Sequence, residues 1–194
     1  LNTTLAEFFV AQFIANKLQK RQESEEISDL LVKVFSSEEY KTVRLFLVSV
    51  MKTFEIHESH MDNIKKTFYL KDERKLNVLH RLLVSNENEK VLHDFLFILP
   101  EVFQINDELK QFLGEKEGEY NRNALCLIAS ENKNEKVLQE FWKFVESKLT
   151  TDELKNMLFE TDSHGFNTFH FAAYYNSKIF LESFVELIKN CLLY

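Results

Sequence analysis

Two histidines lie three residues apart in the segment HESHMD, where one side of a helix could present both to a metal ion. They are His57 and His60, and Glu58 and Asp62 supply nearby carboxylates. The order differs from the His-Glu-x-x-His pattern of zinc hydrolases, and no third or fourth ligand is evident. The pattern therefore favours solvated loop histidines, and we expect no metal site.

Cys126 is the residue that could imitate a catalytic thiol, which would need a base beside it. The nearest histidines are far away along the chain, so a small buried side chain is the better interpretation. The sequence also lacks a Walker A motif, a Gly-x-Ser-x-Gly motif and a Cys-x-x-Cys motif. We therefore expect neither an enzyme nor a cofactor.

Composition and charge restrict the class of protein. The 194 residues carry a formal net charge of -7, which argues against nucleic-acid binding, since that needs a basic surface. Apolar runs fall well short of the roughly 20 residues that a membrane span requires. The two cysteines are far apart in apolar contexts, which favours a reducing, cytoplasmic location. The start LNTTLAEFF has no Met and no basic region, and we interpret it as part of a longer chain.

The elements that must position these residues repeat along the chain. DELKQFL begins at Asp107, DELKNML begins at Asp152, and DNIKKTF begins at Asp62, so the three segments follow at steps of 45 residues. Only 3 glycines and 1 proline are present, which favours long helices joined by short polar links, and the 19 phenylalanines predict an aromatic-rich core. We expect a helix to begin within about three residues of each of these aspartates.

Asparagines mark the same period. NVLH, NALC and NTFH begin at Asn77, Asn123 and Asn167, where each side chain could cap the first helix of a unit. Nine residues after each cap comes a second asparagine, and these are Asn86, Asn132 and Asn176. We expect the second set at reversals between helices, in the left-handed conformation that asparagine tolerates.

The repeated pattern therefore predicts three helices in each unit. The first shows apolar residues at i, i+3 and i+4, such as Leu79, Leu82 and Leu83. The second helices are expected at about 89–99, 135–148 and 178–193, and the third begins with the Asp-Glu-Leu-Lys segment. The aspartate of this segment, or the polar residue before the aspartate, could cap the third helix. Further helices are expected near 25–35 and 37–54.

The segment DSHGFNTFHFAAYYN resembles the ankyrin repeat. Asp162, Gly165, His170, Ala172 and Ala173 match that family's pattern in register. The Leu, Thr and Gly places of the pattern are taken by Phe169, Asn167 and Asn176. The resemblance implies an all-α, right-handed α-solenoid of ankyrin-like helical repeats with an extra helix per unit.

The earlier copies diverge from the ankyrin pattern. Leu82 and Leu83 replace the Ala-Ala pair in one copy, and Cys126 replaces the His in the other. The period of about 45 residues also exceeds the 33 residues of ordinary ankyrin units and suits armadillo or HEAT arrays, which stay an alternative. The family implies that His80 and His170 form local hydrogen bonds that support the turn.

The first 60 residues differ from the array at 61–194. TLAEFFVAQFIANKL resembles the segment that follows the nucleotide-binding module in NACHT-type signalling ATPases, with Thr4, Ala6, Glu7 and Phe8 matching. The alternatives are a simple capping helix and a degenerate first repeat.

The function expected from this pattern is protein–protein recognition through a concave face and the turn tips. The residues expected to contact the partner are Val84, Ser85, Ser130, Glu131, Tyr174, Tyr175, Asp72, Arg74, Tyr120, Arg122, His164 and Phe166. A regulatory tail of a signalling NTPase is the alternative. The C-terminal segment ELIKNCLLY is apolar, so Leu192, Leu193 or Tyr194 could pack on further repeats or on a second copy.

Overall fold

The computed structural model describes residues 3–19, 25–53, 58–176 and 178–192. These residues form helices and connecting loops without any strand, as the low glycine and proline content predicts. None of the helices in these ranges is long and apolar enough to cross a membrane.

The first part of the chain forms helices where the pattern predicts them. These are α1 (Thr3–Gln19), α2 (Glu25–Val34), the 3-10 turn η1 (Glu38–Tyr40), α3 (Lys41–Thr53) and α4 (Glu58–Tyr69). The rest of the chain contains α5 (Val78–Ser85), α6 (Glu89–Val102), α7 (Asn106–Leu113), α8 (Ala124–Leu127) with its π-helical continuation η2 (Ile128–Asn132), α9 (Glu135–Lys148), α10 (Thr151–Phe159), α11 (Thr168–Tyr175) and α12 (Lys178–Leu192).

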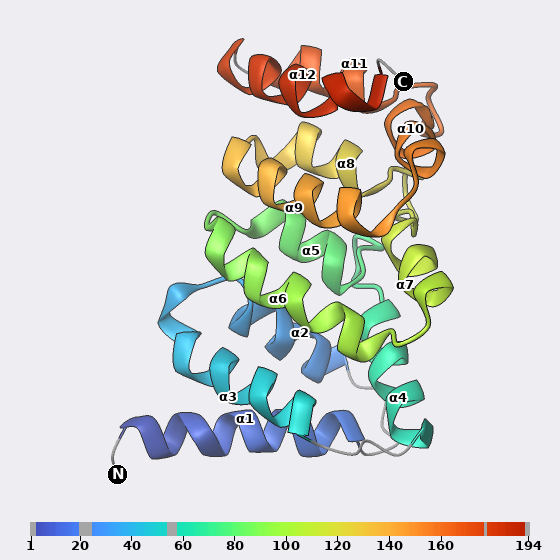
Figure 1. Cartoon of the computed structure of the whole chain (residues 1–194). Coiled ribbons are helices and arrows are strands. Elements are labelled where there is room, and N and C mark those ends of the chain that lie inside the picture. Colours follow the sequence, from blue (N-terminus) through green and yellow to red (C-terminus); the bar gives the residue numbers. More distant parts are fainter. Residues whose placement is uncertain (1–2, 20–24, 54–57, 177, 193–194) are drawn as a thin grey trace.

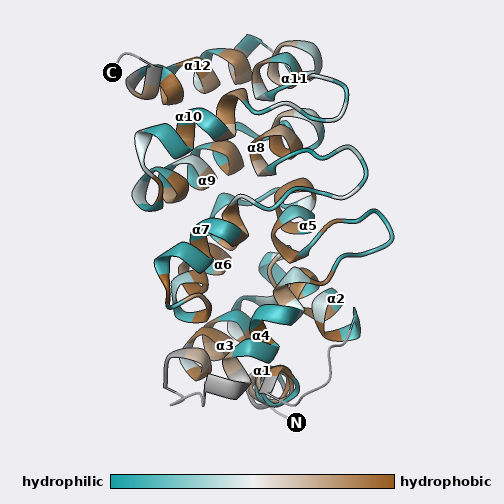
Figure 2. Ribbon diagram, turned by 90° about the vertical axis from the view of Figure 1, so that its right-hand side faces the viewer, coloured by the Kyte–Doolittle hydropathy of each residue, from teal (hydrophilic) through white to brown (hydrophobic). Residues whose placement is uncertain are grey.

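The helices stack in four successive layers (Figure 1). We number them as α2–α4, α5–α7, α8–α10 and α11–α12. The first helices α2, α5, α8 and α11 contact one another in that order, and so do the second helices α3, α6, α9 and α12. Helix α1 packs on α3 and α4 at the N-terminal end of the stack. Figure 2 shows the loops that precede α5, α8 and α11 stacked along one edge.

The core that joins the layers is rich in phenylalanine, as predicted. Phe68, Phe95, Phe103 and Phe112 are buried and form one cluster, with the rings of Phe103 and Phe112 stacked at 4.6 Å. Phe68 belongs to the first layer and the other three belong to the second, so the cluster holds two layers together by burying aromatic surface.

The caps of the first helices are as predicted. The side-chain oxygens of Asn77, Asn123 and Asn167 accept hydrogen bonds from the backbone N–H three residues later, at 2.9, 3.0 and 3.3 Å. Each bond satisfies one of the N–H groups that a helix start leaves without a partner.

The second set of asparagines lies at the reversals, but the left-handed prediction for it is wrong. Asn86 and Asn176 are extended, with φ of -80° and -114°, and Asn132 ends η2. Their side chains instead bond to backbone of the preceding layer, which decides their conformation. The left-handed residues lie elsewhere, at Lys75, Asn121, Lys133 and Gly165.

The third helices agree with the prediction in two of three cases. Helices α7 and α10 begin one residue before Asp107 and Asp152, whereas α4 begins at Glu58, four residues before Asp62. Thr150 caps α10 in a reciprocal box with Glu153. The predicted side-chain cap of α7 is absent, because Ile105 occupies the cap position.

Candidate functional site

Acidic side chains shape the loops at the edge of the stack. In the loop before α11, the Asp162 carboxylate accepts hydrogen bonds from the backbone N–H groups of His164 and Phe166, both at 2.8 Å. Gly165 between them has a φ of +84°, which a residue without a Cβ adopts readily. The turn closes on Asp162 and leaves the Phe166 side chain about half exposed at the tip.

In the loop before α8, Glu117 organises the backbone as Asp162 does in the loop before α11. Its carboxylate is buried and accepts hydrogen bonds from the backbone N–H groups of Glu119 and Tyr120 at 2.8 and 2.7 Å. Burial on its own raises the pKa of this carboxyl, but these bonds and those from Arg122 bring the pKa below its usual value. Glu117 therefore stays ionised and holds the loop and the Arg122 guanidinium together.

A charged cluster extends from this loop onto the first helices. Arg122 donates to Glu131 at 2.9 Å and to the Ser130 hydroxyl at 3.2 Å. Arg74, from the loop one layer earlier, reaches the same Glu131 at 2.6 Å. The charges in this cluster pair with one another, so it aligns adjacent loops with the end of η2.

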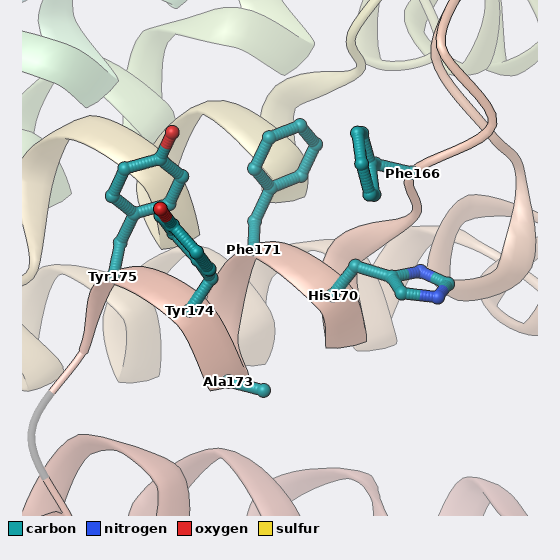
Figure 3. Close-up of a pocket in the computed structure, with 6 residues that line it drawn as sticks. All are labelled: Phe166, His170, Phe171, Ala173, Tyr174 and Tyr175. Atoms are coloured by element: carbon teal, nitrogen blue, oxygen red, sulfur yellow. The ribbon is translucent and has the colours of Figure 1, made fainter.

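An aromatic patch lies beside this cluster, and we define it as Phe166, Phe171, Tyr174 and Tyr175. The Phe166 and Phe171 ring centroids are 6.1 Å apart, and Phe171 stacks on Tyr175 at 6.2 Å. Tyr174 meets Tyr175 edge-on at 4.7 Å. With His170 and Ala173 they line a pocket, and Figure 3 shows the Phe166, Phe171 and Tyr175 rings in a row along α11.

The aromatic patch is open to solvent. The exposed fractions are 81% for Tyr174, 45% for Tyr175 and 48% for Phe166, whereas Phe171 forms the buried floor. Lys133 lies at one end, with its ammonium nitrogen 5.9 Å from the Tyr175 ring centroid. Among the described residues Lys133 forms no ion pair, so its charge is available to a ligand that occupies the patch.

The structure brings ten of the twelve expected contact residues into these two neighbouring groups. Asp72, Arg74, Tyr120, Arg122, Ser130 and Glu131 belong to the charged cluster and its loops, and His164, Phe166, Tyr174 and Tyr175 surround the aromatic patch. Ser130 is buried, and its hydroxyl bonds internally. Val84 and Ser85 belong to neither group and are the last two residues of α5.

Sequence reasoning missed Glu117, Phe171 and Lys133. Glu117 lies one residue further from its helix cap than Asp72 and Asp162 do from theirs, so a strict period passes over it. An acidic residue near the start of every loop was the signal that could have found it. Nothing in the sequence placed Lys133 next to Tyr175, because η2 and α11 belong to different layers.

Cys126 is the candidate catalytic thiol, and His57 and His60 are the candidate metal ligands. Cys126 is buried, burial raises the pKa of its thiol to about 11, and its sulfur lies 3.4 Å from the Thr168 hydroxyl, so the expected inert role fits. His57 is outside the described residues, and so is the side chain of His60. Within the described ranges no group of three or more His, Cys, Asp or Glu residues could hold a metal ion.

The two repeat histidines differ in their hydrogen bonds. His170 bonds to Asn167 of its own turn at 2.7 Å, as the resemblance implies. The local bond implied for His80 is wrong, because its Nε2 reaches the Glu115 carbonyl oxygen in the loop after α7 at 3.0 Å.

Comparison with known proteins leaves the family of this chain open. No protein-family model matches it, and neither a curated protein nor a solved structure does.

Proposed function

We propose that the chain is an ankyrin-like α-solenoid that recognises a protein partner through its first helices and loop tips. Layers that recur at a step of about 45 residues support this proposal, as do the loops that stack before α5, α8 and α11. Both cysteines are free thiols, which supports a cytoplasmic location. The proposal includes no catalytic step and no cofactor.

The observation that carries the proposal is the exposure of the aromatic patch. Exposed single apolar residues are common on proteins, but adjoining rings around a pocket are typical of interaction sites. Tyrosine offers a large contact area with few rotatable bonds, so ordering it on binding costs little entropy. Tyr174 is 81% exposed, so its side chain contributes little to the core and presents a large surface to a partner.

The charges beside the patch indicate the chemistry of the partner. Arg74 and Arg122 are already paired with carboxylates, so they contribute little net charge to a ligand. Lys133 has no such pair among the residues that the structure describes. A segment with an apolar side chain for the Phe171 floor and an acidic side chain for Lys133 fits best.

Selection from a random peptide library displayed on phage, with the immobilised full chain as bait, tests the proposal. We expect enriched peptides to share an apolar residue close to an acidic one. Changing Tyr174→Ala and Tyr175→Ala together should weaken their binding roughly tenfold or more, because each lost aromatic contact costs about 1–2 kcal/mol.

The matched control is Phe97→Ala, which removes an aromatic ring of similar exposure, 49%, from α6. It should leave peptide binding unchanged. Circular dichroism should show that the double tyrosine variant keeps its helicity and its melting temperature, since exposed substitutions cost under about 0.5 kcal/mol. A double tyrosine variant that melts several degrees lower would place the tyrosines in the core. Equal peptide binding by the wild type, the double tyrosine variant and Phe97→Ala would place the binding site elsewhere.

A further inference from the structure

In the two inner layers, the third helix or the loop after it covers polar groups at the start of the first helix. The Asn123 side-chain amide donates to the Met157 carbonyl oxygen on α10 at 2.7 Å. One layer earlier, His80 reaches the Glu115 carbonyl oxygen in the loop after α7 at 3.0 Å. His80 and Asn123 are both buried, because a third helix and the loop after it cover them.

Charged side chains join the third helices of successive layers. Lys65 on α4 forms an ion pair with Glu108 on α7 at 2.6 Å. Lys110 on α7 forms the equivalent pair with Glu153 on α10 at 2.9 Å. In each pair a lysine on a third helix meets a glutamate in the first turn of the next third helix, so successive layers recognise each other through the same contact.

The last layer presents the equivalent residues uncovered. His170, which is two repeats beyond His80, is exposed, and its Nε2 has no partner among the described residues. Ala173 is exposed, whereas Leu83 and Ala129 at the corresponding positions are fully buried. Lys155, the counterpart of Lys65 and Lys110, has no carboxylate partner in the described part of the chain.

We propose that this terminal face, defined by Lys155, Asn167, His170 and Ala173, is a docking surface for one further helical unit of the same kind. The occupant carries a glutamate in the first turn of a helix, opposite Lys155, and a loop carbonyl oxygen opposite the His170 ring. Figure 3 shows Ala173 on the side of α11 away from the Phe171 ring, where the occupant's first helix would pack.

Continuity with the inner boundaries favours this occupant over a second copy of the chain. Two terminal faces that met each other would bring together only the residues of this face, whose one fully charged member is Lys155. Neither face would then supply the carboxylate or the loop carbonyl that the inner boundaries provide. The inference depends on the contacts within and between the inner layers and does not rest on the proposed peptide recognition, although His170 and Ala173 also line the pocket of the aromatic patch.

The experiment extends the full chain by a second copy of residues 151–194, joined directly after Tyr194. The copied α10 then follows α12 at the same spacing at which α10 follows α9. We expect a higher melting temperature than for the unextended chain. Nuclear magnetic resonance should show changed chemical shifts for the His170 ring and the Ala173 methyl group, because the extension covers both side chains.

Lys155→Glu provides the matched test of the charge contact. It should lower the melting temperature of the extended chain and leave that of the unextended chain nearly unchanged. An extension of the same composition in scrambled order should change neither the melting temperature nor the His170 and Ala173 chemical shifts.

Two results would overturn the proposal. One is a copied segment that is cleaved rapidly by protease while the His170 and Ala173 chemical shifts stay unchanged, which would show that the face does not accept such a unit. The other is sedimentation equilibrium showing that the unextended chain dimerises and that Ala173→Arg abolishes the dimer, which would make a second copy the occupant.

Discussion

The side-chain amide of Asn86 donates a 2.9 Å hydrogen bond to the carbonyl oxygen of Phe35, which follows α2 in the preceding layer. Asn132 donates to the Asn86 carbonyl oxygen at 2.8 Å, and Asn176 donates to the Ala129 carbonyl oxygen. Each asparagine therefore joins its own helix reversal to the end of the first helix one layer earlier, and the bonds form a series along the stack.

Replacing Asn86 by Asp tests the contribution of this series. Aspartate keeps the size of the side chain and can still accept the backbone N–H of Asn88, but it cannot donate to Phe35. We expect the free energy of unfolding to fall by about 2–4 kcal/mol, because a buried carbonyl loses its donor and a carboxylate replaces it. Urea denaturation at pH 7 measures the change. Asn156→Asp on the exposed side of α10 is the control and should cost under about 0.5 kcal/mol.

His80 should make the protein less stable in acid. Burial lowers the pKa of His80 to about 4. Its Nδ1 has no hydrogen-bond partner, so a proton added there would find no acceptor. The unfolded chain binds that proton at about pH 6.5, so the stability contributed by neutral His80 is lost as the pH falls from about 6.5 through 4. At pH 4.5 the loss should be about 2–3 kcal/mol relative to pH 7.

The comparison that isolates this effect is urea denaturation of wild type and His80→Gln at both pH values. The variant should be less stable at pH 7 but should lose less stability on acidification. His164→Gln, in an exposed loop, should keep the wild-type dependence. Parallel profiles for wild type and His80→Gln would assign the acid sensitivity to other groups.

Gly118 permits the close approach of two successive loops. Its N–H donates to the Lys75 carbonyl oxygen, and a Cβ at Gly118 would lie 2.8 Å from the Lys75 Cβ. Gly118→Ala should therefore lower the free energy of unfolding by about 1–3 kcal/mol. Lys75→Gly should restore most of it, because it removes the opposing Cβ and suits the φ of 61° at that position.

A double-mutant cycle by thermal denaturation measures this rescue. Gly165→Ala is the control, since a Cβ there meets nothing within 4 Å and only the φ of +84° opposes it. Lys75→Gly should leave the cost of Gly165→Ala unchanged. Additive effects of Gly118→Ala and Lys75→Gly would argue against the close approach.

Lys133 should set the preference for acidic ligands at the aromatic patch. Lys133→Glu should weaken binding of the selected peptides roughly tenfold, and Lys133→Gln should weaken it less, because only the former repels the acidic residue. Fluorescence anisotropy at low and high salt measures both, and the wild-type affinity should fall with salt. Lys136→Glu on α9, also exposed, is the control and should have little effect.

Much of the helical pattern could be predicted because it depends on neighbours along the chain. A cap bond joins residues three apart, so the roles of Asn77, Asn123 and Asn167 follow from local sequence. The aromatic patch was only partly predictable. Tyr174 and Tyr175 stand where a repeat exposes its first helix, whereas the neighbouring charge of Lys133 and the floor formed by Phe171 come from how the layers meet.

The sequence by itself determined the period, the helices and the caps of the first helices, since backbone hydrogen bonds within one turn specify them. The tertiary structure alone decided which backbone carbonyl each later asparagine reaches, so Asn86 is extended instead of left-handed. It also decided that His80 bonds to the loop after α7 and that His170 stays open to solvent. The physical reason is that these environments arise between residues about 35–50 positions apart, which meet only when the layers stack.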